Sequence, residues 1–142
     1  MEEAEKGKIL VVDDSKAIRR FYCGIFQKNF PDYNVLEADN NKRALLLARR
    51  GDISLLITDH ERGIEVEKGV DLVRELRDSG ASYPILMVSG HVPLKLKQEG
   101  VLEQGVSGII YKPDIFDDIF IKIIGEFLET GKSDTYEAYS RA

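Results

Sequence analysis

Apolar runs alternate with helical patterns of apolar residues five times along the chain. The first, third and fourth runs are almost continuously apolar, as expected of strands that helices cover on both faces. The five predicted strands cover residues 8–12, 33–38, 53–58, 84–88 and 108–111. Strands that alternate with helices form βαβ units with right-handed crossovers. The pattern therefore predicts an α/β fold, with a parallel sheet and helices on both of its faces.

The segments between the first strands carry apolar residues at helical spacing. The first predicted helix covers residues 15–28, with Ser15 as its N-cap. A second starts at Asn40 or Asn41, and a third ends near Gly80.

Two further helices are predicted in the second half of the chain. The segment 92–106 favours a short or mobile helix, because Gly100 lies inside it and Gly105 ends it. The last helix is the clearest, with Asp114 as its expected cap. Its apolar stripe is Phe116, Ile119, Phe120, Ile123, Ile124 and Phe127. We expect this stripe to pack in the core, and the polar residues 129–142 to form a frayed tail or the start of a linker.

The chain has the length of one domain, 142 residues. Its composition, 43% hydrophobic and 32% charged, is ordinary for a soluble globular protein, and no apolar run approaches the ~20 residues of a membrane span. Glu2, Glu3 and Glu5 lie where a secretory signal would carry basic residues. We therefore expect a soluble, cytoplasmic protein with no membrane partner.

The charge and the single cysteine exclude several classes of function. A net charge of -5 gives no general attraction to nucleic acid, so we expect no direct nucleic-acid binding. Cys23 cannot form an internal disulfide or a cysteine-rich zinc site, and we expect it to be a small buried residue on a helix. His60 and His91 lack the spacing of a zinc motif and are expected at the surface.

Polar side chains follow four of the predicted strands, where each strand would reach solvent. Asp13 and Asp14 follow the first strand, Asp59 the third, Ser89 the fourth and Lys112 the fifth. Parallel strands end at one edge of the sheet, and ligands bind at this edge in such folds. Clustered carboxylates repel one another and favour a hard cation such as Mg²⁺, which binds carboxylates together with phosphate oxygens. The edge therefore has the composition of a phosphoryl site.

Phosphoryl transfer to a carboxylate uses these residue types. One carboxylate attacks, the others hold the metal, a hydroxyl donates to one phosphoryl oxygen and an ammonium neutralises another. Pro113, directly after Lys112, ends the strand and favours an extended backbone at the lysine.

Four short motifs occur in order along the chain. They are Lys-Ile-Leu-Val-Val-Asp-Asp-Ser at 8–15, the strand-terminal Asp59, Met-Val-Ser-Gly at 87–90 and Tyr-Lys-Pro at 111–113. Together they resemble the receiver domain of two-component response regulators, the CheY-like superfamily. The resemblance covers residues 8–128 and implies a flavodoxin-like (βα)5 fold with sheet order 2-1-3-4-5. Residues 1–7 and 129–142 are then expected to be flexible tails or a linker.

The resemblance also implies a role for each residue at the edge. Asp59 would be the phosphoacceptor, Ser89 the switch hydroxyl and Lys112 the cationic partner of the phosphoryl group. The implied Mg²⁺ ligands are Asp13, Asp14, Asp59 and the main-chain carbonyl of Glu61. Glu61 and His91 hold positions that border the attacking water in this family, and are expected to tune the lifetime of the phosphoryl group.

In this family the phosphoryl group comes from a histidine kinase or a histidine phosphotransfer protein. Its arrival reshapes the face made by helix 4, strand 5 and helix 5. That face contacts a downstream protein or effector domain, or forms a dimer. The resemblance thus implies a regulatory switch rather than a turnover enzyme, with self-dephosphorylation left open.

Three features depart from the family pattern. The loop after Asp59 lacks the usual Met-Pro pair and is longer and more charged, with Gly69 as the later glycine. The position of the switch aromatic residue, three before the lysine, holds Ile109, which favours a core position or a contact with the fourth helix. Tyr111 is expected on the opposite face of the strand. Gly100 lies within the fourth helix and would weaken it or make it pliable.

Two alternatives account for part of the pattern. A pseudo-receiver would be a protein-interaction module that keeps the fold without phosphorylation, but the intact acidic, serine and lysine positions argue against it. A Mg²⁺-dependent phosphatase would use an aspartyl intermediate, but the run Asp59-His60-Glu61 lacks the Asp-x-Asp spacing of the haloacid dehalogenase family. Residues 64–68 alternate apolar and charged, which fits a short extended segment or a solvated loop.

Overall fold

Five parallel strands form the central sheet of the computed structural model, which describes residues 5–62 and 67–141. They are β1 (Gly7–Val12), β2 (Tyr33–Ala38), β3 (Ile53–Asp59), β6 (Ile85–Ser89) and β7 (Gly108–Tyr111). Their order across the sheet is β2-β1-β3-β6-β7, which is the predicted flavodoxin-like order 2-1-3-4-5. The pattern of apolar runs therefore predicted both the strands and the parallel sheet correctly.

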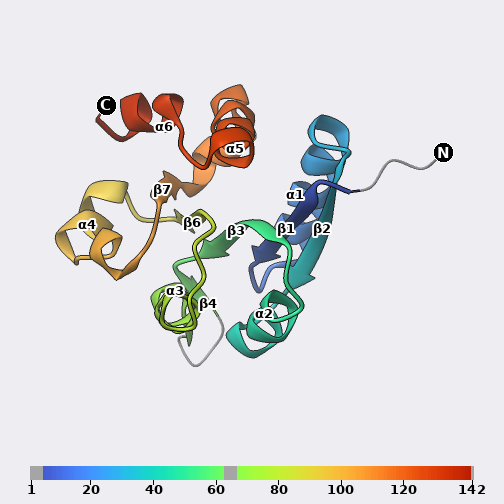
Figure 1. The fold of residues 1–142 in the computed structure, drawn as a ribbon. Helices are drawn as coiled ribbons and strands as arrows, with labels where there is room; N and C mark the ends of the chain where they lie inside the picture. The colour runs from blue at the N-terminus through green and yellow to red at the C-terminus, as the bar shows by residue number, and fades with distance from the viewer. Residues whose placement is uncertain (1–4, 63–66, 142) are drawn as a thin grey trace.

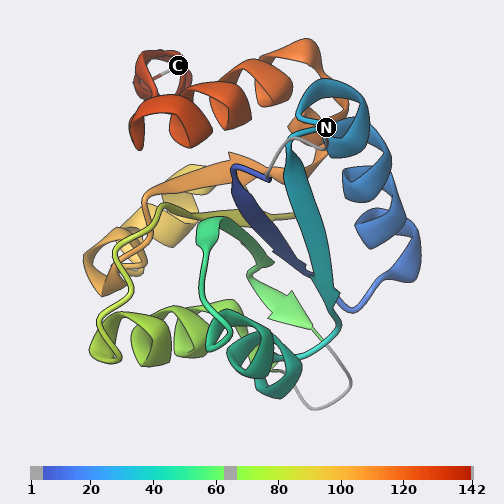
Figure 2. The ribbon, with the colours of Figure 1, turned by 45° about the vertical axis from the view of Figure 1, so that its right-hand side comes forward.

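Helices cover both faces of this sheet (Figure 1 and Figure 2). One face packs against α1 (Lys16–Asn29) and α5 (Asp118–Thr130), and the other against α2 (Asn41–Ala48), α3 (Gly69–Asp78) and α4 (Pro93–Gln98). Each face has its own apolar cluster of buried side chains. Because one fully buried aliphatic or aromatic side chain contributes about 1.5–3 kcal/mol, these two clusters hold the layers together.

Two predicted helix caps are present. The Ser15 Oγ accepts a hydrogen bond from the Ile18 N–H at 3.3 Å, and the Asn40 Oδ1 accepts one from the Arg43 N–H at 2.8 Å. Asn40, not Asn41, is therefore the residue that caps α2. Caps of this kind contribute about 1 kcal/mol each, because the first N–H groups of a helix have no partner within it.

The segment after β6 forms a short helix, as predicted, but Gly100 lies after this helix rather than within it. α4 has six residues, Pro93–Gln98, and Gly100 follows it with a φ of 78°. A 3₁₀ turn, η1 (Leu102–Gln104), then ends at Gly105, where φ is 110°. Glycine adopts this left-handed backbone without the steric cost that other residues meet, so the two glycines set where the helical turns stop.

The last predicted helix begins later than expected. Residues Lys112–Phe116 form a 3₁₀ turn, η2, and α5 starts at Asp118. The Asp117 N–H donates to the Asp114 carbonyl inside η2, so Asp114 does not cap α5. Phe116 and Ile119 were expected in the core but are 62% and 37% exposed. Phe116 belongs to η2, where a 3₁₀ turn has three residues per turn instead of 3.6. Its side chain therefore does not continue the apolar stripe of α5.

Cys23 is half-buried on α1, so the expectation of a buried residue was wrong. Burial and the neighbouring Glu37 carboxylate raise the pKa of its thiol to about 11. The thiol is therefore protonated at neutral pH and a poor nucleophile.

The C-terminal segment differs from the flexible tail that its polar composition predicted. After α5 the chain turns and forms α6 (Asp134–Arg141), which lies beside α5 and close to β7 (Figure 1). The Ser133 Oγ caps α6 by accepting a bond from the Tyr136 N–H at 2.9 Å. Tyr136 is 4% exposed, and its ring packs on Phe127 at 6.1 Å between centroids. At the other end of the chain, Gly7 already belongs to β1 rather than to a tail.

A short antiparallel ribbon precedes α3. It pairs β4 (Glu61–Arg62) with β5 (Glu67–Lys68), and residues 63–66 between them lie outside the described residues. Of the segment 64–68, the described part, 67–68, is extended.

None of the helices in residues 5–62 and 67–141 is both long enough and apolar enough to cross a bilayer.

Candidate functional site

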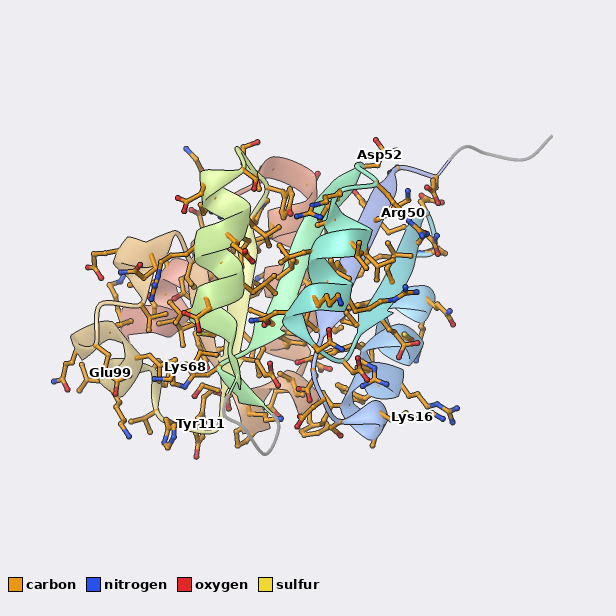
Figure 3. The ribbon with its side chains drawn as sticks, turned by 90° about the horizontal axis from the view of Figure 1, so that it is seen from below. Lys16, Arg50, Asp52, Lys68, Glu99 and Tyr111 are labelled. Atoms are coloured by element: carbon orange, nitrogen blue, oxygen red, sulfur yellow. The ribbon has the colours of Figure 1, made fainter. Side chains whose placement is uncertain are left out.

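The predicted site residues lie at the carboxyl ends of the strands. Figure 3 shows the two ends of the sheet: Lys16, Lys68 and Tyr111 lie toward one end, and Arg50 and Asp52 toward the other. The first of these ends is where β1, β3, β6 and β7 finish. The chain enters each strand at the end near Asp52 and leaves it at the end near Tyr111.

Strand register brings two of the acids side by side. β1 and β3 are parallel neighbours in which Val12 lies opposite Thr58, so the next residues, Asp13 and Asp59, leave the sheet together. Both are nearly buried, at 1% and 5% exposed, whereas Asp14 is exposed. One carboxylate oxygen from each of the three lies within 4.8 Å of the others. The structure thus brings together the acidic cluster that the sequence predicted.

Local hydrogen bonds fix Asp13. Its Oδ1 accepts from the Ser15 N–H at 2.8 Å, and its carbonyl accepts from Nη1 of Arg19 at 2.8 Å. Arg19 also pairs with Glu37 at 3.2 Å, so a side chain from the second turn of α1 holds the loop after β1. The sequence analysis did not identify Arg19, although its place four residues after the Ser15 cap put it on the face of α1 nearest this loop.

Lys112 supplies the positive charge that the cluster needs. It follows the last residue of β7, and its Nζ lies 3.5 Å from Oδ2 of Asp13. The lysine side chain is 35% exposed, so solvent screens the pair only partly. The ammonium offsets part of the repulsion among the carboxylates and remains reachable from the pocket beside them.

Ser89 lies at the end of β6 and is 2% exposed. Its hydroxyl oxygen accepts a hydrogen bond from the His91 N–H at 3.0 Å. This bond leaves the hydroxyl hydrogen able to donate to another acceptor.

A pocket of about 270 Å³ opens beside Asp59. It is lined by Asp59, His60, Val88, Ser89, Gly90, His91 and Lys112. The exposed His91 and the half-buried His60 flank it with ring centroids 6.3 Å apart in an edge-on arrangement. Both histidines were expected at the surface, but only His91 is exposed. Their contact was not predicted, because the loops that carry them are 31 residues apart.

Gly69 allows α3 to start directly under the site. Its N–H donates to the His60 carbonyl at 2.8 Å, and a Cβ at this position would collide with the carbonyl of Asp59. The later glycine noted in the sequence therefore has a steric role, because the backbone of α3 approaches β3 too closely for a side chain.

Tyr22 of α1 lies beneath the acids. Its side chain is 1% exposed, and no hydrogen-bond partner for its hydroxyl occurs among the described residues. Burial, with smaller contributions from the charges of Asp13 and Asp59, raises the pKa of this hydroxyl well above its ordinary value. Tyr22 lies within the predicted helix 15–28, and the helical spacing of apolar residues there gives no sign of a buried polar atom.

We expect Tyr22→Phe to raise the free energy of unfolding by about 1 kcal/mol, because an unpaired buried hydroxyl costs about 1–3 kcal/mol and phenylalanine keeps the ring. Urea denaturation measures the change. Tyr33→Phe, on β2 where the ring is only half-buried, is the matched control and should leave stability unchanged. A loss of stability in Tyr22→Phe would mean that the hydroxyl makes a bond, for example through a buried water.

The donor set of the site fits a hard divalent cation. Carboxylate oxygens are the ligands that Mg²⁺ prefers, and Asp13, Asp14 and Asp59 present them within reach of one ion. Glu61 begins β4 two residues after Asp59, and its main-chain carbonyl as a further ligand stays a prediction.

The position of the switch aromatic residue is apolar and buried. Ile109 is 0% exposed and belongs to the cluster that contains Leu96 of α4, as its apolar character predicted. The expected orientation of Tyr111 was wrong, because residues two apart in a strand share a face. Tyr111 accordingly lines a groove with Val92 and Leu94, on the α4 side.

The chain is similar to known proteins. A family model described as response regulator receiver domain matches residues 9–124. The chain is 31% identical over 111 residues to the chemotaxis protein CheY-3 of Vibrio cholerae, which covers 75% of this chain and 80% of that protein. It is 35% identical over 113 residues to histidine kinase P4 of Formosa agariphila. This alignment covers 78% of this chain but only 8% of the kinase.

A solved structure shows the same fold. It is the receiver domain of the histidine kinase CKI1 from Arabidopsis thaliana, complexed with Mg²⁺ and BeF₃⁻. The two structures superpose with a TM-score of 0.69 and are 23% identical in sequence. The match covers 89% of this chain and 91% of the CKI1 chain. The family match spans all the acids, the serine and the lysine described above. The chain therefore belongs to the response regulator receiver domain family of two-component systems.

Proposed function

We propose that Asp59 accepts a phosphoryl group from the histidine of a histidine kinase or a phosphotransfer protein, and that the modified protein presents a changed surface to a downstream protein or effector domain. The observation that carries the proposal is the cluster of Asp13, Asp14 and Asp59 carboxylates within 4.8 Å, next to the Lys112 ammonium and the pocket. A nucleophile, metal ligands and a cation thus meet where a phosphoryl group fits.

In the proposed reaction a carboxylate oxygen of Asp59 attacks phosphorus. The new O–P bond forms as the bond from phosphorus to the donor nitrogen breaks, and the histidine leaves with its electron pair. Lys112 neutralises charge on one phosphoryl oxygen, and the Ser89 hydroxyl donates to another. Both groups are already at the pocket, so little reorganisation is needed.

The proposed Mg²⁺ ligands are Asp13, Asp14, Asp59 and the main-chain carbonyl of Glu61. When bound, Mg²⁺ neutralises the clustered carboxylates and the phosphoryl oxygens, so that an anionic nucleophile can approach an anionic group. Asp13 keeps its position through the Ser15 N–H and the Lys112 ammonium. The receiver of CKI1, which has the same fold, was solved with Mg²⁺ and BeF₃⁻, and this supports the assignment.

The proposal describes a regulatory switch rather than a turnover enzyme. The proposed location is the cytoplasm, as the composition suggested, and no direct nucleic-acid contact is proposed, as the net charge suggested. A dimer through α4, β7 and α5, which the resemblance implied, is one proposed output. The experiment that tests the proposed function is incubation with acetyl phosphate and Mg²⁺ followed by intact mass spectrometry. We expect the protein to gain one phosphoryl group, and we expect chelation of the metal to prevent this gain. An unmodified protein would favour the pseudo-receiver, and steady release of phosphate from unrelated esters would favour the phosphatase.

The lifetime of the phosphoryl group is proposed to depend on His91 and Glu61. His91 is exposed at the pocket rim next to Ser89, where a water could attack phosphorus. We expect His91→Ala and Glu61→Ala each to change the first-order rate of phosphate loss several-fold, measured by mass spectrometry after removal of acetyl phosphate. Identical rates in both variants and the wild type would exclude this role.

A further inference from the structure

β7 is the edge strand of the sheet, and α6 lies against its open side. In a parallel strand alternate N–H groups point away from the neighbouring strand, and at an edge these donors have no strand partner. Here the Ile109 N–H donates to the Tyr136 hydroxyl and the Tyr111 N–H donates to the Tyr139 hydroxyl, each at 2.9 Å. Two tyrosines of one helix therefore take the bonds that a sixth strand would make.

The same helix reaches past β7. The Tyr139 hydroxyl donates to Oδ2 of Asp114 at 2.7 Å, so it joins the strand to η2. Burial and this bond to Asp114 raise the pKa of Tyr139 above its ordinary value, so the hydroxyl stays protonated and can donate. Tyr139 thus holds residues 111 and 114, on either side of Lys112.

Other contacts anchor α6 at its two ends. Glu126 of α5 accepts from the Ser133 and Thr135 hydroxyls, at 2.8 and 2.7 Å, and from the Thr135 N–H at 3.0 Å. Near the C-terminal end, Nζ of Lys97 on α4 donates to the Ser140 carbonyl at 2.9 Å. α6 therefore connects α5, β7 and α4, and it occupies the outer side of the sheet edge (Figure 1).

The site and α6 share one short segment of chain. Lys112 points its ammonium to Asp13, 3.5 Å away, while its neighbours in sequence are bonded to Tyr139. Through the Tyr111 N–H and the Asp114 carboxylate, Tyr139 therefore restrains the segment from which the lysine pairs with Asp13. A phosphoryl group on Asp59 adds negative charge that attracts the ammonium away from Asp13.

We propose that α6 can be displaced from the β7 edge. Tyr139 links the binding of α6 at this edge to the site, so that a phosphoryl group on Asp59 loosens α6. This inference rests on the proposed function. Tyr139 is a positioning residue, since it acts on the site through the backbone around Lys112. Loosening of α6 uncovers the β7 edge.

Coupling between two sites is reciprocal, so it can be measured from either end. If a phosphoryl group loosens α6, then variants that loosen α6 must favour the phosphorylated form. Tyr139→Phe removes the hydroxyl at the strand, and Glu126→Ala removes the anchor at the far end of α6. Tyr33→Phe is the matched control, because Tyr33 lies on β2 at the opposite edge of the sheet.

The test measures the affinity of beryllofluoride, a phosphoryl mimic, for the full chain in saturating Mg²⁺. We expect Tyr139→Phe and Glu126→Ala each to bind it about 5-fold or more tightly than the wild type, the lower end of typical allosteric coupling, and Tyr33→Phe to bind it equally. Hydrogen exchange gives a second readout. Beryllofluoride should speed exchange of the Ile109 and Tyr111 amides in the wild type.

The outcomes separate the two proposals. Suppose that the wild type binds beryllofluoride and accepts a phosphoryl group, but neither variant changes the affinity and the exchange rates of the two amides stay the same. Then α6 only supports the edge, and this inference is overturned while the proposed function stands. If the wild type neither binds the mimic nor accepts phosphoryl, the proposed function fails and the inference fails with it. Circular dichroism checks that both variants remain folded, and Glu126→Ala tests the coupling without any change at β7.

Discussion

Asp59→Asn is expected to abolish phosphorylation by acetyl phosphate. Asparagine has nearly the shape of aspartate, but its amide is a poor nucleophile and carries no negative charge. The fold should persist, because removal of one of three clustered anions relieves repulsion, and we expect the urea midpoint to rise rather than fall. Intact mass spectrometry measures the modification, and the same sample supplies the unfolding curve.

Asp52→Asn is the matched control for this variant. Asp52 lies at the opposite end of β3, is exposed, and has a φ of 64°, a conformation that asparagine adopts readily. We expect it to accept a phosphoryl group at the wild-type rate. A phosphoryl group found on Asp59→Asn would place the acceptor elsewhere, with Asp13 as the first candidate, and would overturn the proposed function.

The strands and the acidic site could be predicted because their signal is local. Each apolar run stops abruptly at a polar residue, and a parallel sheet brings all such ends to one edge. The residues after Val12 and Thr58 therefore had to meet once the strand order was known. The same geometry predicted that Lys112, which follows the fifth strand, lies at this edge with the acids.

The parts that escaped prediction depend on contacts between distant segments. α6 looked like a tail because its tyrosines count as polar, yet their hydroxyls are bonded to the backbone of β7, and the ring of Tyr136 is buried. Phe116 looked like core because the pattern gave no sign of a 3₁₀ turn between Pro113 and α5. The hydroxyl of Tyr22, which has no partner among the described residues, could not be predicted, because the ring of this side chain fits the apolar spacing of the helix.

Lys112→Met should slow phosphorylation of Asp59 by about 10²- to 10³-fold, the usual cost of losing one preorganised group that stabilises developing charge. Methionine retains an unbranched side chain of similar length and removes only the charge. The rate is measured by intact mass spectrometry at saturating Mg²⁺ and a fixed concentration of acetyl phosphate. Lys95→Met, at an exposed position of α4, is the control that changes net charge equally without touching the site.

The affinity for Mg²⁺ distinguishes a catalytic role of Lys112 from a structural one. The ammonium lies 3.5 Å from Asp13 and repels a cation that binds there, so Lys112→Met should bind Mg²⁺ as tightly as the wild type or more tightly. Asp13→Asn should weaken Mg²⁺ binding, because it removes an anionic donor. If Lys112 only held the cluster together, its loss would weaken Mg²⁺ binding as Asp13→Asn does, and saturating metal would restore the rate. A slow reaction at full metal occupancy would show that the lysine acts on the phosphoryl group itself.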